Sequence, residues 1–519
     1  MRKTKIVCTI GPASDTEEIM IGLCKAGMNV ARLNFSHSTY EEHQRRIDLV
    51  KKVRTDLNLP IAIMLDTKGP EYRIKTFKNQ KITLKDGDKF TFTTDDVVGD
   101  ETRVSVSYKN LPAELSVGDT ILLNNGLLTF EVENIEGANI NCLVKIGGEL
   151  SDRKSMSFPG KVMQQEYLSE QDKKDIAFGI KNDVDYIACS FVSKRQDLID
   201  VHNYLKEINA DSVELIAKIE NQSGVDNIEE ICKECDGIMV ARGDMGVEIP
   251  FKMLPAIQKK LITKCRLLGK RVITATEMLE SMISNPRPTR AEISDIANAV
   301  YDGTSAIMLS GETAAGKYPV ESVKTMAEIA ETTESNTHYD KRFRNAAFEI
   351  RNSADAVSHS TCGIAIDLDA KAIVACSLSG MTARMVSRFR PPVPILGLTT
   401  DERTWRRLAL SWGVIPAICE RFTSTDVLFY TAKKIAEKDL ALSKGDKIII
   451  TARLPFCSVR SLYTAYFRAV FPIPAPNDIG TYHFPATTWK YALQPRHLLS
   501  SLYPPIRRFN SVDLTTCIF

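Results

Sequence analysis

Eight short runs rich in Val, Ile and Ala constrain the fold of this chain more than any other sequence feature. Longer amphipathic stretches separate the runs, a pattern that is typical of parallel α/β proteins. Nearly every run ends in polar residues, as expected of strands that present an active site at the C-terminal end of a barrel. We therefore predict a (β/α)8 barrel whose strands fall at 5–11, 29–36, 61–67, 185–192, 214–221, 236–246, 271–278 and 304–312.

The polar residues at the strand ends form the predicted site. Each of them alone could cap a helix or satisfy a turn, but a shared position at one end of so many strands favours a common site. They are Arg32, Asn34, Ser36, Asp66, Thr67, Lys218, Glu220, Asp244, Thr276, Ser310 and Glu312.

An insertion interrupts the alternation between the third and fourth runs. Within it, apolar and polar residues alternate, and Gly, Asp and Asn turn signals separate the segments. This pattern predicts an antiparallel β domain, a small barrel, which at the catalytic end could close over substrate as a lid. Its predicted strands are 81–85, 89–94, 120–123, 127–133 and 139–146.

A second α/β series follows the barrel, with strands predicted at 372–377, 394–398, 413–418 and 447–451. Because long helical patterns precede it, we interpret it as a separate C-terminal domain that starts near residue 340. The predicted domains are a catalytic barrel at 1–69 and 166–340, a lid at 70–165, and an effector-type α/β domain at 341–453.

The segment 454–519 loses this patterning. It contains no glutamate, and prolines interrupt it too often for regular helices, yet it carries many Phe, Tyr and Leu residues. A shifted reading frame entering near residue 453 would explain the change, and a genuine appended segment is the alternative. We expect an atypical tail that is largely disordered and prone to aggregate.

Bulk properties exclude several classes of protein. A net charge of +2 over 519 residues argues against a dedicated nucleic-acid binder. No apolar run approaches the roughly 20 residues of a membrane-spanning helix, and the N-terminus lacks the apolar stretch of a signal peptide. The 12 cysteines have no regular spacing. This suits reduced thiols, so we expect a cytoplasmic protein.

Two short motifs have ordinary explanations. Residues 311–317 nearly fit a phosphate-binding loop, but Tyr318 replaces the Ser or Thr that would bind Mg²⁺, so the match is interpreted as a coincidence. Cys232 and Cys235 form a lone CxxC without a second ligand pair, which favours ordinary thiols over a metal site.

Lys218, Glu220 and Asp244 carry the clearest chemistry. Lys218 and Glu220 alternate onto one face of a strand end, where a purely structural ion pair is an open alternative. Glu220 and Asp244, from neighbouring strands, would form a sparse oxygen site of the kind that Mg²⁺ prefers. A lysine beside such a metal suggests stabilisation of a transferring phosphoryl group or an enolate.

Several long motifs in order resemble the pyruvate kinase family. They cover 29–37, 65–71, 216–221, 241–246, 274–282 and 285–302, with the family's spacing and its inserted lid, and the resemblance extends from residue 1 to about 452. It implies transfer of a phosphoryl group from phosphoenolpyruvate to ADP, which gives pyruvate and ATP in the final step of glycolysis. Departures from the usual pattern at Ser193, Glu277 and 124–126 leave the residues nearest the substrate intact.

The resemblance implies catalytic and substrate-binding roles. Arg32 would hold the substrate phosphate, Lys218 would stabilise the phosphoryl group in flight, and the backbone of Gly243 and Asp244 would receive the carboxylate. Thr276 would organise protonation of the enolate. The predicted catalytic side chains are Arg32, Lys218, Thr276 and Ser310.

The resemblance also implies the cofactors and the nucleotide contacts. Glu220 and Asp244 would bind Mg²⁺ or Mn²⁺. Nucleotide phosphates would meet Arg73 and, from the lid, Lys154. Nearby nucleotide contacts would be His37 and Asn34, and the K⁺ site would be Asn34, Ser36, Asp66 and Thr67.

Regulation and assembly are implied more loosely. The segment 377–382 joins a strand to a helix and resembles the family's effector loop, with Ser377, Ser379, Gly380 and Thr382 as its ligands for a phosphorylated effector. An ordinary strand-to-helix turn is the alternative. The family suggests a homotetramer.

Two other functions stay open on the residues alone. A pyruvate-forming aldolase or lyase would also use a barrel, Mg²⁺ and an enolate, but it would have no use for nucleotide contacts at Arg73 and Lys154. A catalytically inactive protein could keep the barrel as a binding module. ADP-dependent turnover separates both from a kinase.

Overall fold

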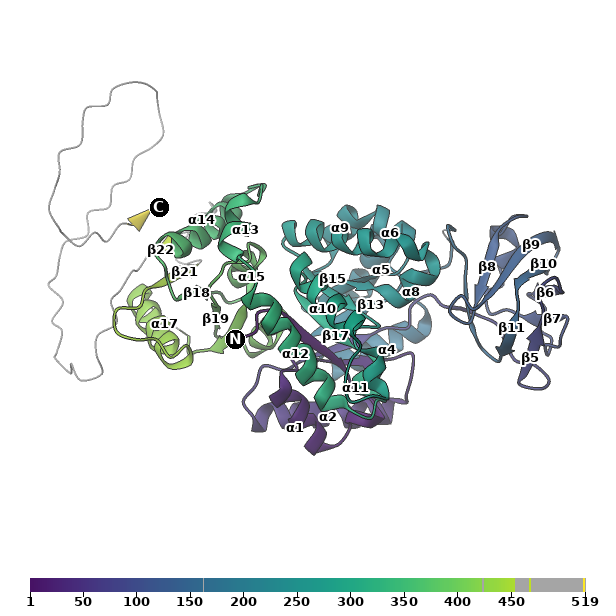
Figure 1. Cartoon of the computed structure of the whole chain (residues 1–519), viewed down its shortest axis with the longest axis horizontal. Helices are drawn as coiled ribbons and strands as arrows, with labels where there is room; N and C mark the ends of the chain where they lie inside the picture. Colours follow the sequence, from purple (N-terminus) through teal and green to yellow (C-terminus); the bar gives the residue numbers. More distant parts are fainter. Residues whose placement is uncertain (162, 422–423, 453–465, 468–516, 519) are drawn as a thin grey trace, which may run out of the picture.

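The barrel lies at the centre of the molecule, between the lid on one side and the C-terminal domain on the other (Figure 1). This is a computed structural model, and it describes residues 1–161, 163–421, 424–452, 466–467 and 517–518. The predicted tail therefore lies outside the described residues, apart from two dipeptides that pair antiparallel, β22 (Tyr466–Phe467) and β23 (Cys517–Ile518).

All eight predicted barrel strands form, and together they close a parallel barrel. In barrel order they are β1 (Lys5–Thr9), β17 (Ala306–Leu309), β16 (Arg271–Ala275), β15 (Gly237–Ala241), β14 (Glu214–Ile219), β13 (Tyr186–Cys189), β3 (Ala62–Asp66) and β2 (Val30–Asn34).

Helices surround the barrel, and local signals fix where many of them begin. Three begin with a capping box in which the hydroxyl of Thr39, Ser169 or Thr289 accepts a backbone N–H. The helices are α1 (Glu17–Ala26), α2 (Tyr40–Asp56), α4 (Glu170–Lys181), α5 (Arg195–Glu207), α6 (Gln222–Asp226), α7 (Ile228–Glu234), α8 (Arg242–Glu248), α9 (Leu254–Leu267), α10 (Arg290–Asp302), α11 (Gly311–Ala314) and α12 (Pro319–Ser335), with short 3-10 turns at Pro12–Ser14, Phe251–Met253 and Glu280–Ile283.

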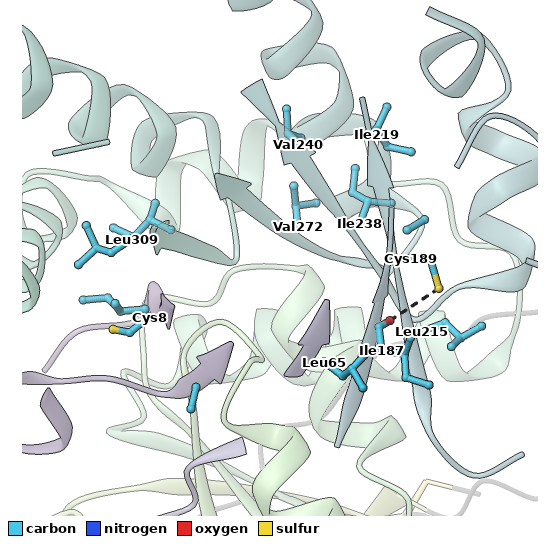
Figure 2. Close-up of a cluster of buried hydrophobic side chains, with 14 of the residues drawn as sticks. Cys8, Leu65, Ile187, Cys189, Leu215, Ile219, Ile238, Val240, Val272 and Leu309 are labelled. Atoms are coloured by element: carbon cyan, nitrogen blue, oxygen red, sulfur yellow. Dashed lines mark hydrogen bonds between the residues drawn. The ribbon is translucent and has the colours of Figure 1, made fainter. Parts of the chain in front are cut away.

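Alternation along the barrel strands produces two separate cores. One set of side chains packs outward against the helices; Figure 2 shows part of it, including Leu65, Ile187, Ile219 and Val240. The other set fills the barrel interior, and it includes Val30, Met64, Ala188 and Ile216.

The lid follows β3 and contains more strands than the alternation predicts. Its main sheet has the order β4 (Tyr72–Arg73), β12 (Ser155–Ser157), β8 (Thr120–Leu123), β9 (Leu128–Glu136), β10 (Asn139–Ile146), β6 (Lys89–Thr93) and β7 (Arg103–Ser105). An isolated antiparallel bridge joins Ile74, which follows β4, to Val106, which follows β7, so the two edges of this sheet approach each other. A further pair is β5 (Lys81–Leu84) with β11 (Gly148–Ser151), and α3 (Leu111–Glu114) is the lid's short helix.

Two details of the lid differ from the prediction. The sheet is not wholly antiparallel, because β6 and β7 pair in parallel. The strands β4, β7, β11 and β12 were not predicted. Segments of two or three residues, as in β4, β7 and β12, are too short to show alternation.

The C-terminal domain contains the four predicted strands in one parallel sheet of order β20 (Val414–Ile418), β19 (Ile395–Thr399), β18 (Ala372–Cys376) and β21 (Ile448–Ala452). Its helices are α13 (Tyr339–Asn345), α14 (Ser353–Asp367), α15 (Met381–Arg388), α16 (Glu402–Leu408) and α17 (Thr425–Asp439).

The C-terminal domain reaches into the barrel. Leu410 is fully buried within the barrel's interior cluster, and the Tyr186 hydroxyl donates to the backbone carbonyl of Arg407. Side chains from both parts therefore share one core.

Within the described part of the chain, no helix is both long and apolar enough to cross a bilayer. The ten cysteines described there are free thiols, and Cys232 lies with its Sγ 3.6 Å from that of Cys265.

Candidate active site

Every second side chain of a barrel strand faces the barrel interior, and this places the site residues at the strand ends. Val30, Met64 and Ile216 face into the barrel, so the residues two positions later, Arg32, Asp66 and Lys218, face the same way at the strand ends. All three are buried. Side chains alternate along each strand, and the parallel strands end on the same side of the barrel. Arg32, Asp66 and Lys218 therefore meet although they are far apart in the sequence.

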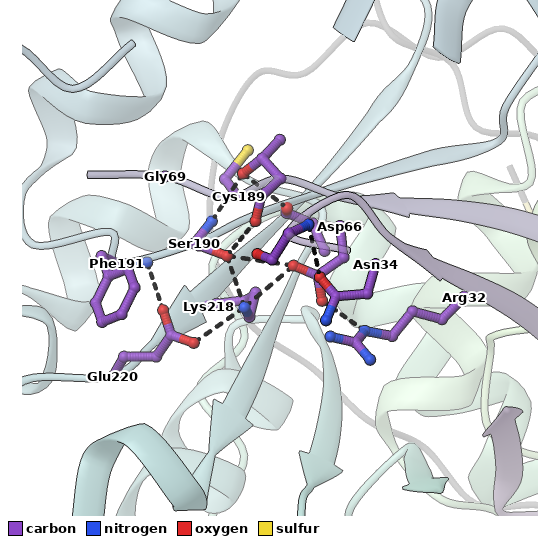
Figure 3. A network of polar contacts seen from close by, with 12 residues as sticks. Arg32, Asn34, Asp66, Gly69, Cys189, Ser190, Phe191, Lys218 and Glu220 are labelled. Atoms are coloured by element: carbon purple, nitrogen blue, oxygen red, sulfur yellow. Dashed lines mark hydrogen bonds and ion pairs between the residues drawn. The ribbon is translucent and has the colours of Figure 1, made fainter. Parts of the chain in front are cut away.

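Lys218 is the hub of this cluster (Figure 3). Its Nζ lies 3.1 Å from Asp66 Oδ1 and 3.0 Å from Glu220 Oε1, and it donates to Ser190 Oγ at 2.6 Å. On the other side, Arg32 Nε donates to Asp66 Oδ2 at 2.6 Å. Two cations and two carboxylates thus alternate across the end of the barrel.

The pKa shifts show how strongly these charges depend on one another. Burial alone would raise the pKa of Asp66, but Arg32 and Lys218 outweigh it and lower that pKa. Burial would lower the pKa of Lys218, but Asp66 and Glu220 outweigh it, so that pKa is raised and the ammonium stays charged. These charges are therefore fixed in place before any substrate arrives.

The negative charge of buried Glu220 is not fully balanced by the positive charge of Lys218. Burial raises its pKa to about 8, Lys218 opposes the rise, and the nearby charge of Asp244 adds to it. Its Oε2 accepts the backbone N–H of Phe191, whereas the buried Oε1 has no hydrogen-bond donor beyond the Lys218 ion pair. A further cation beside Glu220 would therefore be stabilised.

These residues fit a divalent ion of the magnesium type. Asp244 is exposed in the first turn of α8, so its oxygens are accessible next to buried Glu220. The described residues contain no group of three or more His, Cys, Asp or Glu arranged for a metal. Two carboxylates plus water and substrate oxygens are the donor set that Mg²⁺ commonly uses.

The predicted monovalent-cation residues lie together where β2 and β3 end. Asn34 and Asp66 are direct neighbours across this pair of strands. Asn34 Oδ1 accepts the N–H of Ser36 at 3.1 Å, and Thr67 Oγ1 accepts the N–H of Ser190 at 3.2 Å. The arrangement is rich in oxygen donors, as a K⁺ site requires.

Thr276 lies in a strained loop after β16. Its φ is +71° and that of Glu277 is +53°, values that non-glycine residues seldom adopt. Thr276 Oγ1 accepts the N–H of Gly243 at 2.7 Å, so the predicted carboxylate-binding amide is next to the predicted proton-transfer hydroxyl.

Arg242 holds this loop in place. It donates to the backbone carbonyls of Ala275 and Thr276, and it forms an ion pair with Asp295 at 2.6 Å. Such support from surrounding structure is what allows strained φ values to persist.

Ser310 lies at the end of β17, at the N-terminus of α11. Its Oγ is buried without a hydrogen-bond partner, while its N–H donates to Glu312 at 2.7 Å. Glu312 also accepts the N–H of Leu279 at 3.0 Å, which ties Ser310 to the loop that carries Thr276. An unpaired buried hydroxyl next to a predicted site suits contact with a ligand.

The predicted nucleotide contacts are divided between two parts of the molecule. Arg73 and Lys154 belong to the lid, where Ile74 N–H donates to the Lys154 carbonyl at 3.0 Å. His37 is exposed on the barrel, and its carbonyl lies 2.9 Å from His43 Nε2. Arg73 is already bound by Glu71, at 2.8 and 3.0 Å, so a nucleotide phosphate would have to compete with that carboxylate.

The predicted effector loop does join a strand to a helix, between β18 and α15. Gly380 has φ +74°, and Ser377 Oγ accepts the N–H of Thr382 at 3.4 Å, while Ser379 is exposed. The two arginines of α15 point elsewhere, since Arg384 pairs with Glu214 and Arg388 with Asp355.

Three contributors were missed from the sequence. Ser190 lies two positions after the interior residue Ala188, so strand alternation could have identified it. Thr9, which accepts from Arg32 at 2.8 Å, ends the first strand in the same manner. The role of Arg242 gives no local signal, because Asp295 is 53 residues away.

Comparisons with known proteins show which family the chain belongs to. The chain matches the family described as "Pyruvate kinase, barrel domain" over residues 1–323 and the one described as "Pyruvate kinase, alpha/beta domain" over residues 355–462. A pyruvate kinase of Clostridium acetobutylicum is 48% identical over 457 residues, which cover 88% of this chain and 97% of that protein. A pyruvate kinase of Staphylococcus aureus is 48% identical over 458 residues, which cover 88% and 78% respectively. A crystal structure of a pyruvate kinase from Cryptosporidium parvum superposes with a TM-score of 0.84 at 37% identity, covering 87% of this chain and 94% of that one.

Proposed function

Since the chain belongs to the pyruvate kinase family, we propose that the cluster around Lys218 is the centre at which it transfers a phosphoryl group from phosphoenolpyruvate to ADP. The reaction gives pyruvate and ATP, the final step of glycolysis. The observation that carries this assignment is the buried Lys218 ammonium between Asp66 and Glu220 at the C-terminal end of the barrel.

Arg32 and Lys218 would bind the phosphoryl group. Arg32 uses Nε and Nη1 for Asp66 and Thr9, which leaves Nη2 to donate to a phosphate oxygen. Lys218, held by three partners, would stabilise the charge on the equatorial oxygens as the bond to the enol oxygen breaks. Since both cations are pre-positioned, little reorganisation is needed in the transition state.

Glu220 and Asp244 would hold the divalent ion. When bound, that ion supplies positive charge to the phosphate and enolate oxygens. The backbone of Gly243 and Asp244 would receive the substrate carboxylate, and the Gly243 N–H would then leave the Thr276 hydroxyl. Thr276, with Ser310 beside its loop, would organise delivery of a proton to the enolate carbon. That proton converts the enolate to the ketone and makes the transfer strongly downhill.

The decisive test is a coupled assay of pyruvate release. We expect turnover to require ADP and a divalent ion, because the phosphoryl group must be accepted by the nucleotide. A lyase would release pyruvate without ADP, and an inactive binding module would release none. Either result would refute the proposed reaction.

The same assay tests the monovalent cation. We expect turnover to fall when K⁺ is replaced by tetramethylammonium, because Asn34, Ser36, Asp66 and Thr67 form the proposed K⁺ site. Glu71 is held by Lys68 at 3.3 Å and by Arg73, and Glu71→Lys would supply a positive charge internally. This variant should reduce the K⁺ requirement, and full wild-type activity without K⁺ would argue against the site.

We also propose that the loop 377–382 binds a phosphorylated sugar or nucleotide, which activates the enzyme. The exposed Ser379 beside a helix N-terminus supports this. The test is to add such phosphates one at a time to the assay. An activating phosphate should lower the phosphoenolpyruvate concentration that gives half-maximal activity, by about tenfold for a coupling free energy near 1.4 kcal/mol. Ser379→Glu should abolish the response, and exposed Ser443→Glu should keep it. An unchanged response in Ser379→Glu would rule out this loop. A separate proposal is that the enzyme is a homotetramer.

A further inference from the structure

Ser190 lies beside the ammonium group of Lys218 at the end of the barrel (Figure 3). It directly follows β13, which lies between β3 and β14 in the barrel, and it is buried. Its Oγ accepts a hydrogen bond from Lys218 Nζ at 2.6 Å, whereas the carboxylates of Asp66 and Glu220 lie 3.1 and 3.0 Å from the same nitrogen. The serine hydroxyl is thus the closest of the three partners of Lys218.

Ser190 is itself held in place from three sides. Its hydroxyl donates to the Thr67 carbonyl at 2.7 Å, and its N–H donates to Thr67 Oγ1 at 3.2 Å. Its carbonyl accepts a hydrogen bond from the Tyr167 hydroxyl at 2.7 Å. Gly69 approaches so closely that a Cβ added there would lie 2.9 Å from Ser190 Cβ. These contacts fix the position of Ser190 Oγ independently of Lys218.

The three partners of Lys218 differ in charge. Asp66 and Glu220 hold the ammonium group and also offset its positive charge, whereas the hydroxyl of Ser190 is neutral and holds it without that loss. An ammonium group has three protons, so a phosphoryl oxygen can accept one only if an existing contact is given up. Because the two carboxylate contacts are the longer ones, the contact with Ser190 is the one expected to persist.

We propose that Ser190 is a positioning residue, which holds the ammonium group of Lys218 in the orientation needed for phosphoryl transfer. It acts through Lys218 and not on the substrate. This rests on the proposed function, because it assumes that Lys218 stabilises the phosphoryl group in flight. A charge contributes most to such a step when it is already in position, and a displacement of about 1 Å can cost about a hundredfold in rate.

The first test is the variant Ser190→Ala. It should lower kcat by about 10- to 100-fold, because the ammonium group loses its shortest contact and can shift. KM for phosphoenolpyruvate should change by less than about threefold, because Arg32 still binds the phosphate. The matched control is Ser322→Ala, which removes another buried hydroxyl that donates to a backbone carbonyl at 2.7 Å, in α12, and it should keep the wild-type kcat. A wild-type kcat in Ser190→Ala, or a change in KM alone, would overturn the proposal.

A double-mutant cycle separates positioning from a direct role. In a Lys218→Met background, Ser190→Ala should lower kcat by no more than about twofold, because its effect passes through the ammonium group that is already missing. If Ser190→Ala costs as much in this background as in wild type, Ser190 acts independently of Lys218 and the proposal is wrong.

The same four proteins allow a measurement that does not depend on turnover. Ser190→Ala should lower the thermal midpoint of unfolding more in wild type than in the Lys218→Met background, because only the ammonium group needs this acceptor. Equal shifts in the two backgrounds would contradict the proposal. An inactive wild type would instead refute the proposed function, and the thermal midpoints would still decide whether Ser190 holds Lys218.

Discussion

Replacing Lys218 with methionine is expected to lower kcat at least about a hundredfold while the barrel stays folded. The ammonium lies 3.1 Å from Asp66 and 3.0 Å from Glu220, so its charge is fixed where the phosphoryl group is proposed to pass. Methionine keeps the length of the side chain but removes that charge. Because Glu220 already has a raised pKa, it can take up a proton, which limits the cost of losing its cation.

The measurement is kcat and KM for both substrates, together with the thermal midpoint of unfolding. Lys81→Met, which removes an exposed lysine paired with Glu149, is the matched control and should leave all of these unchanged. A Lys218→Met enzyme with wild-type kcat and only a raised KM would show that Lys218 acts in substrate binding alone.

Glu220→Gln is expected to raise the Mg²⁺ concentration for half-maximal activity by about a hundredfold and to lower kcat as well. Both carboxylate oxygens of Glu220 face donors, namely Lys218 Nζ and the Phe191 N–H. A glutamine must turn its NH₂ group toward one of them, so it loses a contact in addition to the negative charge that would hold the metal.

Glu277→Gln is the matched control for this substitution, because Glu277 is an exposed neighbour of Thr276. It makes the same chemical change near the site without touching the proposed metal ligands. Titration of Mg²⁺ in the assay, and of Mn²⁺ by electron paramagnetic resonance, gives the comparison. Equal metal dependence in Glu220→Gln and wild type would exclude Glu220 as a ligand.

The barrel and its polar strand ends could be predicted because their signals are local. Period-two alternation places Arg32, Asp66 and Lys218 inside the barrel once the interior residues before them are identified. The same rule identifies Ser190, which lies two positions after the interior residue Ala188. Because the eight strands are parallel, their C-terminal ends lie on the same side of the barrel, so the polar residues there can be expected to share one site.

Features that depend on distant partners could not be predicted. The left-handed backbone at Thr276 persists because Arg242 and Asp295 support it, and no pattern in the sequence joins those positions. The lid ladder of β4 and β12 pairs Arg73 with Ser155, and these two strands are too short to show alternation. The ion pairs that engage Arg384 and Arg388 connect them to Glu214 and Asp355 rather than to a phosphate.

The shared core around Leu410 has a consequence for how the molecule loses its structure. This side chain comes from the C-terminal domain yet is fully buried among barrel residues, and the Tyr186 hydroxyl is bonded to the Arg407 carbonyl. Neither part can release the other without exposing apolar surface inside the barrel, at roughly 25 cal/mol for each Å². Removing or exchanging the C-terminal domain is therefore expected to lower the stability of the barrel.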